Sequence, residues 1–206
     1  MPHERTKPRT VNSIRCVAHL LYEWDHQLPV DAHKGFAVSP AGNINRTGEL
    51  CGTYADIFTP KESQFTASLE PGVRPLVTAI TGAGFVTYTS CEGHRYDASS
   101  SECHVGLLPR GTPELRLLLR ALRMCAVGVN PYLQVCRAAV YPWYLYDESN
   151  ARCVPVVDLY LHQRPCIDLC NYFRHRSEDV LRVAAFAQKI FPSALAAPYD
   201  HAARYD

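Results

Sequence analysis

The hydrophobic positions along the chain recur with two different periods, one typical of helices and one typical of strands. Apolar residues at i, i+3, i+4 and i+7 predict four helices, at residues 12–28, 70–84, 111–128 and 177–190. The third pattern is the most regular, because its leucines fall on one side, while Thr112 suits an N-cap and Pro113 the first turn.

Alternation of apolar and polar residues predicts strands between these helices, at residues 34–38, 85–90, 103–109, 133–146 and 153–162. Helices thus alternate with strands, and the last two strands follow each other across the turn-like sequence DESN. This order predicts an α+β fold, with a mostly antiparallel or mixed sheet and helices packed on it. We find no repeat and no linker, so we expect one domain over residues 1–206, with a loop-rich excursion at 39–63.

Composition is that of an ordinary globular protein: 206 residues, 47% hydrophobic and 20% charged. The net charge of +1 provides no overall field that would attract nucleic acid or a membrane, so a charged partner requires a local patch. The first ten residues are charged and no run of eighteen apolar residues occurs, which predicts a cytoplasmic protein without a membrane partner.

The nine cysteines are odd in number and irregularly spaced. Together with the charged N-terminal sequence, this predicts reduced thiols rather than a disulfide framework. Because free cysteine behaves as a small hydrophobic residue, we expect Cys16, Cys125, Cys136 and Cys170 to be largely buried.

One short stretch, TSCEGH at residues 89–94, concentrates reactive side chains where a predicted strand ends. Functional residues are common at such strand ends. Cys91 and His94 are the candidate catalytic pair, and Ser90, Glu92 and Gly93 are candidate ligand-binding residues.

Three functional interpretations of this turn remain open beside a purely structural one, in which Cys91 is a small buried residue. In the first interpretation, Cys91 is a nucleophile and His94 is its base. Alternatively, Cys91 and His94 begin a zinc site that Cys103 and His104 complete, although neighbouring residues on a strand point to opposite faces. In the third interpretation, backbone N–H groups of the turn bind an anionic ligand.

Two other polar groups are candidates for ligand binding. Asp158, Tyr160 and His162 share one face of a predicted strand, where an acid and a histidine can carry out proton transfer if that face lines a cleft. Arg116 and Arg120 form a stripe opposite the leucines of the third helix, which is either a phosphate-contacting face or a solvated helix surface.

The stretch from Asp56 to His94, about forty of 206 residues, resembles the N-terminal part of the tRNA wybutosine-synthesizing methyltransferases of the third step. In that family an Asp, a Lys and a Ser precede a helix, a turn and a strand that ends in Thr-Ser-Ser-Cys-Ser-Gly-Arg. The matching positions here are Asp56, Lys61, Ser63, Thr89, Ser90, Cys91 and Gly93. Glu92 replaces the serine that follows the cysteine, and His94 replaces the arginine.

The resemblance implies an α/β fold and S-adenosylmethionine-dependent methylation of a modified guanosine in tRNA. The residues and the resemblance together predict that the Cys91 turn binds or modifies a nucleotide or an RNA-type ligand, as a transferase if the family's activity applies. The alternative is a non-enzymatic protein in which the same turn binds zinc or a protein partner. Glycine-rich phosphate-binding motifs do not occur in the sequence.

Overall fold

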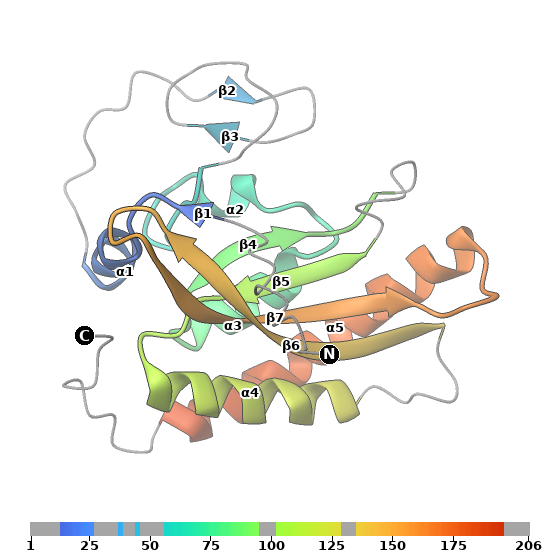
Figure 1. Ribbon diagram of the computed structural model, residues 1–206. Coiled ribbons are helices and arrows are strands. Elements are labelled where there is room, and N and C mark those ends of the chain that lie inside the picture. Colours follow the sequence, from blue (N-terminus) through green and yellow to red (C-terminus); the bar gives the residue numbers. More distant parts are fainter. Residues whose placement is uncertain are drawn as a thin grey trace, which may run out of the picture.

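The computed structural model describes residues 13–26, 37–38, 44–45, 56–94, 102–128 and 135–195 (Figure 1). Its centre is a five-stranded sheet in the order β1-β6-β7-β5-β4, and two short strands, β2 (Ala37–Val38) and β3 (Ile44–Asn45), pair separately. The strands of the main sheet are β1 (Ser13–Ile14), β4 (Thr87–Cys91), β5 (Cys103–Leu107), β6 (Cys136–Asp147) and β7 (Arg152–Gln163). All neighbours in this sheet are antiparallel except β1 and β6, which are parallel. The predicted α+β fold with a mixed sheet is confirmed.

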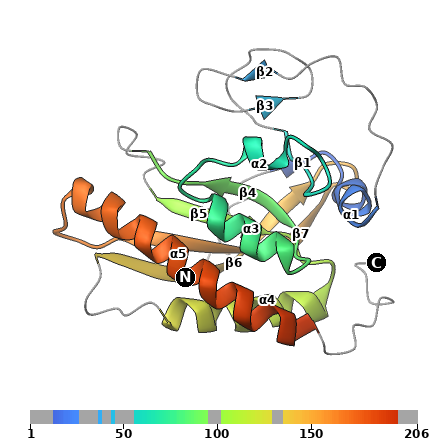
Figure 2. The ribbon, with the colours of Figure 1, turned by 180° about the vertical axis from the view of Figure 1, so that it is seen from behind.

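Three helices cover one face of the sheet, as the view from behind shows (Figure 2): α3 (Arg74–Gly82), α4 (Thr112–Val127) and α5 (Leu169–Leu195). Two further helices, α1 (Val17–Asp25) and the single turn α2 (Phe65–Ser68), lie elsewhere, and Trp24 of α1 packs edge-on against Phe65 of α2. The other face of the sheet is turned towards the viewer in Figure 1. No described helix covers this face where β4 ends, and we call this part of it the open face.

The core lies mainly between the sheet and the three helices. The alternate residues Val157, Leu159 and Leu161 of β7 are buried there, together with Leu118 and Leu122 of α4. The helical leucine pattern and the strand alternation therefore produce the two layers that they predict. A smaller buried cluster joins Cys136, Tyr172 and Phe173.

The α5 helix differs from its prediction, because it begins eight residues before Ser177. Asp168 provides the N-terminal cap through a 2.9 Å hydrogen bond from the backbone N–H of Asn171, whereas the Ser177 hydroxyl donates to the Phe173 carbonyl within the helix. The added turns carry Tyr172, whose hydroxyl accepts from the Cys103 N–H and donates to the Leu161 carbonyl. Two strands and the helix are joined by this one side chain.

Other predicted features are corrected in detail or fall outside the description. The α4 helix begins at Thr112 with Gly111 as its N-cap, so Thr112 is not the cap. The predicted excursion at 39–63 lies largely outside the described residues, apart from β3 and residues 56–63. No helix within the described ranges is long and apolar enough to cross a membrane.

The eight cysteines that the structure describes are all free thiols. Cys125 and Cys136 are buried as expected, but Cys16 is only partly buried and Cys170 is exposed. Cys16 is held at the surface because its sulfur caps α1, accepting from the His19 N–H at 3.4 Å. Cys170 lies in the first turn of α5, within the extension that the sequence pattern missed.

Candidate functional site

The turn after β4 is closed by a glycine in a conformation that other residues rarely adopt. Gly93 has a φ of 78°, in the left-handed region. The Gly93 N–H donates to the sulfur of Cys91 at 3.2 Å, so the turn folds back over the thiol. This local geometry places Cys91 and His94 beside each other at the end of the strand.

Three side chains of different chemistry meet at this turn: Glu70, Cys91 and His94. The Nε2 atom of His94 lies 3.5 Å from the Cys91 sulfur and 3.3 Å from a Glu70 carboxylate oxygen. One ligand atom from each residue lies within 4.8 Å of the other two. Glu70 and Cys91 are partly buried and His94 is exposed, so solvent reaches the group.

Glu70 joins the site because the chain runs out along α3 and returns along β4. Nine helical residues rise about 14 Å and five strand residues about 16 Å. A helix followed by a strand of similar length brings the start of the one beside the end of the other. The sequence pattern contains this information, but Glu70 was missed because it lies 21 residues before Cys91.

Neighbouring groups hold the turn in place. The second carboxylate oxygen of Glu70 accepts from the Glu92 N–H, and the Glu92 carboxylate accepts from the Gly72 N–H. Arg176 of α5 donates to the carbonyls of Glu92 and Gly93, and its guanidinium lies 4.5 Å from the centre of the Phe173 ring. Only 6% of Arg176 is exposed. Sequence reasoning missed this residue, because the charged segment around it resembles a solvated helix start.

Burial and nearby acids change the chemistry of the thiol. Burial raises the pKa of Cys91 to about 11; the Gly93 N–H opposes the shift, whereas Glu70 and Glu92 add to it. At neutral pH the Cys91 side chain is therefore a thiol. A nucleophilic mechanism requires the thiolate, which this environment does not supply by itself.

A row of rings continues from the turn across the open face. His104 of β5 pairs in register with Cys91 on one side and with Tyr160 of β7 on the other. The Tyr160 ring stacks on His104 at 5.2 Å and on His162 at 5.3 Å, between ring centres. Tyr141 of β6 meets both Tyr160 and His162 edge-on. We call His104, Tyr141, Tyr160 and His162 the ring row.

The ring row is held by polar contacts at its His162 end and has an uncharged imidazole at its His104 end. His162 contacts the Glu102 carboxylate at 2.6 Å and the Tyr141 hydroxyl at 3.0 Å through its two nitrogens. Burial lowers the pKa of His104, although Glu70 and Glu102 oppose the shift, so this imidazole is neutral at pH 7. Tyr141 and Glu102 were not singled out from the sequence, since neither belongs to a local motif.

Asp158 lies on the same strand face as Tyr160 but is buried. Its carboxylate accepts a 2.7 Å hydrogen bond from Tyr88, and burial raises the pKa of Asp158 to about 6, against the lowering effect of that bond. Strict alternation predicts Tyr88 on the opposite face from Cys91, but an irregularity between Thr87 and Thr89 changes the register. Gly106 makes the change possible, since a Cβ there would lie 2.6 Å from the Tyr88 ring.

Several candidate residues are not part of this constellation. Ser90 pairs with the core residue Val105, which places it on the opposite face from Cys91. Cys103 is buried in the core, so the four-ligand set of Cys91, His94, Cys103 and His104 is not assembled. Neighbouring strand residues point to opposite faces, which is the physical reason. Arg116 and Arg120 are exposed on α4, in the helical layer.

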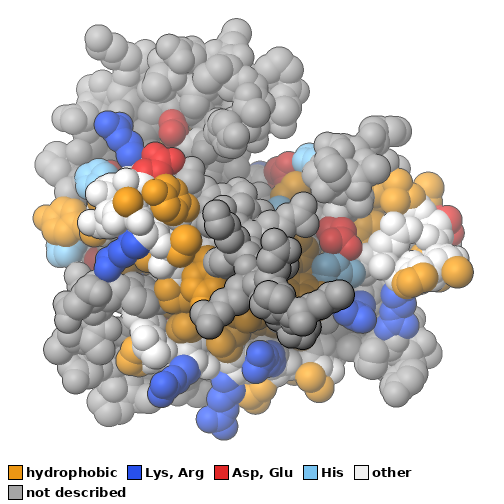
Figure 3. Space-filling view, in the orientation of Figure 1, with side chains coloured by type: hydrophobic (Ala, Val, Ile, Leu, Met, Phe, Trp, Pro, Cys, Tyr) orange, Lys and Arg blue, Asp and Glu red, His pale blue; other side chains and the backbone are white. Residues whose placement is uncertain are grey.

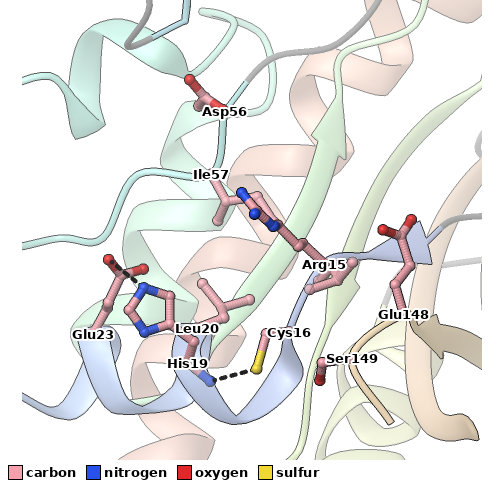
Figure 4. Close-up of a pocket in the computed structure, with 10 residues that line it drawn as sticks. Arg15, Cys16, His19, Leu20, Glu23, Asp56, Ile57, Glu148 and Ser149 are labelled. Atoms are coloured by element: carbon pink, nitrogen blue, oxygen red, sulfur yellow. Dashed lines mark hydrogen bonds and ion pairs between the residues drawn. The ribbon is translucent and has the colours of Figure 1, made fainter. Parts of the chain in front are cut away.

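The space-filling view looks onto the side of the molecule that includes the open face (Figure 3). A separate hollow of about 660 Å³ lies beside α1 and is lined by residues that include Arg15, His19, Asp56 and Glu148 (Figure 4). Asp56 is thus placed near α1, and the Lys61 ammonium donates to the Asp25 carbonyl at the end of α1. Two residues of the family-like pattern therefore lie around α1, and the remainder of that pattern runs to the end of β4.

Comparison with known proteins adds no relative to this picture. No protein-family model matches the chain, and neither the curated proteins nor the solved structures give a significant match. The resemblance to the wybutosine-synthesizing methyltransferases therefore rests on the residues of the 56–94 stretch, and the site is interpreted from its own geometry.

Proposed function

We propose that the open face binds a nucleotide or an RNA-type ligand between the Cys91 turn and the ring row. The observation that carries the proposal is that two separate candidates from the sequence, the Cys91 turn and the Tyr160 strand face, lie side by side. Cys91 pairs with His104, and His104 pairs with Tyr160, on three adjacent strands. Aromatic and imidazole rings on a sheet face are a recurrent way to contact unstacked bases. The resemblance of residues 56–94 to enzymes that act on tRNA supports the same class of ligand.

The polar groups beside the rings complement such a ligand. The Tyr141 hydroxyl contacts His162 and keeps further hydrogen-bonding capacity, because a hydroxyl can donate once and accept twice. The base edges of single-stranded RNA are read by such groups. The net charge of +1 provides little general attraction to phosphates. Affinity is therefore expected to depend on ring contacts more than on salt.

The test is binding of single-stranded RNA oligonucleotides and mononucleotides, measured by fluorescence anisotropy or calorimetry. Because His104 and His162 flank the two faces of the Tyr160 ring, a base can meet only its edge. Tyr160→Ala should therefore weaken binding by about 2- to 12-fold, which corresponds to the roughly 0.5–1.5 kcal/mol of one edge-to-face aromatic contact. Tyr22→Ala is the matched control, because Tyr22 is an exposed tyrosine of α1 that stacks on His26, just after the helix. Equal affinities of the Tyr160→Ala variant and the wild type would contradict the proposal.

Two arginines on the helical layer provide a second comparison. Arg116→Glu and Arg120→Glu reverse charges on α4 and leave the open face unchanged. If the open face is the site, these variants should bind with nearly wild-type affinity. A large loss of affinity and of salt dependence would instead assign ligand binding to the α4 arginine stripe.

The transferase activity is the finer part of the proposal and is supported by the resemblance alone. It predicts transfer of a labelled methyl group from S-adenosylmethionine to an RNA that the protein binds. RNA binding without methyl transfer would leave a binding function and remove the transferase part.

A further inference from the structure

The carboxylate, thiol and imidazole at the end of β4 have an arrangement that their mutual contacts alone do not explain. The single Nε2 atom of His94 faces both the Cys91 sulfur, at 3.5 Å, and a Glu70 oxygen, at 3.3 Å. That atom carries either one proton or one lone pair, so it makes one ordinary hydrogen bond at a time. A cation between the three atoms would satisfy all of them together.

The distances match those of a tetrahedral zinc centre. Zinc bonds of about 2.3 Å to sulfur and about 2.0 Å to nitrogen or oxygen hold sulfur and nitrogen about 3.5 Å apart, and nitrogen and oxygen about 3.3 Å apart. The two distances in the structure are 3.5 Å and 3.3 Å. We therefore propose that Glu70, Cys91 and His94 bind one zinc ion and leave its fourth position open to water or a ligand atom.

The choice of metal follows from the donor atoms. Sulfur and imidazole ligands select zinc and related soft or borderline ions, whereas magnesium and calcium take oxygen ligands. Three protein ligands with an open position are typical of zinc sites that bind a further molecule, and four are typical of structural sites. Glu70 thus replaces the Cys103 and His104 ligands that the sequence suggests.

Outer contacts of the kind found around bound metals are already present. The Glu92 N–H orients the Glu70 carboxylate, and the Gly93 N–H donates to the Cys91 sulfur. Arg176 donates to the carbonyls of the same two residues, Glu92 and Gly93. Such contacts fix ligand orientation around metals, and here the turn after β4 and the α5 helix contribute them.

The chain contains an internal control with the same residue types. Cys16 and His19 repeat the Cys-x-x-His spacing, and Glu23 lies 3.4 Å from the His19 ring. Figure 4 shows that the sulfur of Cys16 lies at the His19 backbone nitrogen, while the His19 ring faces Glu23. Among the described residues, the group that converges within metal-binding distance is Glu70, Cys91 and His94. Spacing alone is therefore insufficient.

The test is titration of chelator-treated protein with cobalt(II), followed by displacement with zinc. We expect one ion per chain, a thiolate-to-cobalt charge-transfer band, and visible bands of tetrahedral cobalt. Cys91→Ser should abolish the charge-transfer band. His94→Ala and Glu70→Gln should each weaken zinc binding at least about 100-fold, the upper end of losses seen for residues that only orient a ligand. Cys16→Ser and His19→Ala should bind zinc as the wild type does.

Three outcomes would overturn the site: no charge-transfer band in the wild type, a band that persists in Cys91→Ser, or equal losses in the Cys16 and Cys91 variants. His94 is exposed, so His94→Ala should fold even if another variant does not, and circular dichroism checks each protein. The titration contains no nucleotide. Its failure therefore leaves the proposal for the ring row standing. Unchanged RNA affinity in Tyr160→Ala would contradict the ring-row proposal and would leave the zinc site standing.

Discussion

Asp158 shows how one buried residue makes stability depend on pH. Burial raises its pKa from 3.8 to about 6, so the folded protein binds more protons than the unfolded chain between those values. The contribution of Asp158 to the free energy of unfolding is therefore fully present below about pH 4, and it is lost as the pH rises towards and through 6. Asp158→Asn keeps an acceptor for the Tyr88 hydroxyl and cannot ionise. It should raise the free energy of unfolding at pH 7 by up to about 3 kcal/mol, the value of two pKa units.

The measurement is urea denaturation of the wild type and the variant at a series of pH values from 4 to 8. Asp179 is the matched comparison, because it is also buried and burial raises its pKa to about 6, although Arg182 lies 3.4 Å away. Each Asp→Asn substitution should reduce the decline of the free energy of unfolding with rising pH, and the double variant should reduce it further. A decline in Asp158→Asn that equals the wild-type decline would disprove the role of Asp158.

At the residue scale, the sequence predicted the side chains that belong to local patterns. Cys91 and His94 stand out as a turn, and Tyr160 and His162 as alternate positions of a strand. Glu70 and Arg176 could not be found in this way, because they meet the turn only after the chain has reversed direction. The Tyr88 position depends equally on a distant residue, since the lack of a side chain at Gly106 admits its ring.

At the scale of elements, the first turn of α1 depends on a carboxylate that lies 130 residues away in the chain. Asp147 ends β6, is fully buried and accepts hydrogen bonds from the Val17 N–H, the Ser149 hydroxyl and the Asn150 amide. Burial raises the pKa of Asp147, but these bonds outweigh burial and lower it below 3.8. Its contribution is therefore present above about pH 4 and is lost as the pH falls through the lowered value.

Asp147→Ala should lower the free energy of unfolding at pH 7 by about 2–3 kcal/mol, because the Val17 N–H at the start of α1, the Ser149 hydroxyl and the Asn150 amide all lose their acceptor. Glu148→Gln removes the adjacent, exposed carboxylate and should change stability by less than about 0.5 kcal/mol. Thermal and urea denaturation at pH 7 measure both. If the two variants lose the same stability, Asp147 does not anchor α1.

Element boundaries were predicted well where the apolar pattern is strong and poorly where polar residues are buried. The strands β6 and β7 lie within three residues of their predicted limits. The α5 helix begins earlier than expected because Tyr172 and Arg176 bury polar atoms against the sheet and the turn. Polarity in the sequence suggested a solvated segment, whereas the polar side chains are buried against partners that lie up to 84 residues away in the chain.

At the scale of the whole molecule, the fold class followed from the order of helices and strands, but the strand order did not. Alternation shows which residues share a face, yet it does not identify the neighbouring strand. β5 pairs with β7 although α4 and β6 lie between them in the chain, and β1 pairs with β6 across about 130 residues. Such contacts depend on the packing of α3, α4 and α5 against one face, which no local pattern contains.

The expectation of a single domain makes a prediction about three buried thiols on three different elements. Cys103 of β5 and Cys125 of α4 lie in the main core, and Cys136 of β6 lies in the smaller cluster beside α5. Burial raises the pKa of all three, to about 12, 11 and 12. In the folded state an alkylating reagent therefore reaches these sulfurs poorly, and only a small fraction of each is the reactive thiolate. If the two clusters unfold together, the three should become reactive at one shared urea concentration.

Isotope-coded alkylation with peptide mass spectrometry measures each cysteine separately across a urea series. Cys153, Cys166 and Cys170 are exposed and provide the control, since they should react without denaturant. Cys103, Cys125 and Cys136 should remain protected and then share one midpoint, because Tyr172 connects the smaller cluster to β5 and β7 through its hydroxyl. A lower midpoint for Cys136 would mean that the start of α5 and its cluster unfold as a separate unit, and the prediction of one cooperative domain would be wrong.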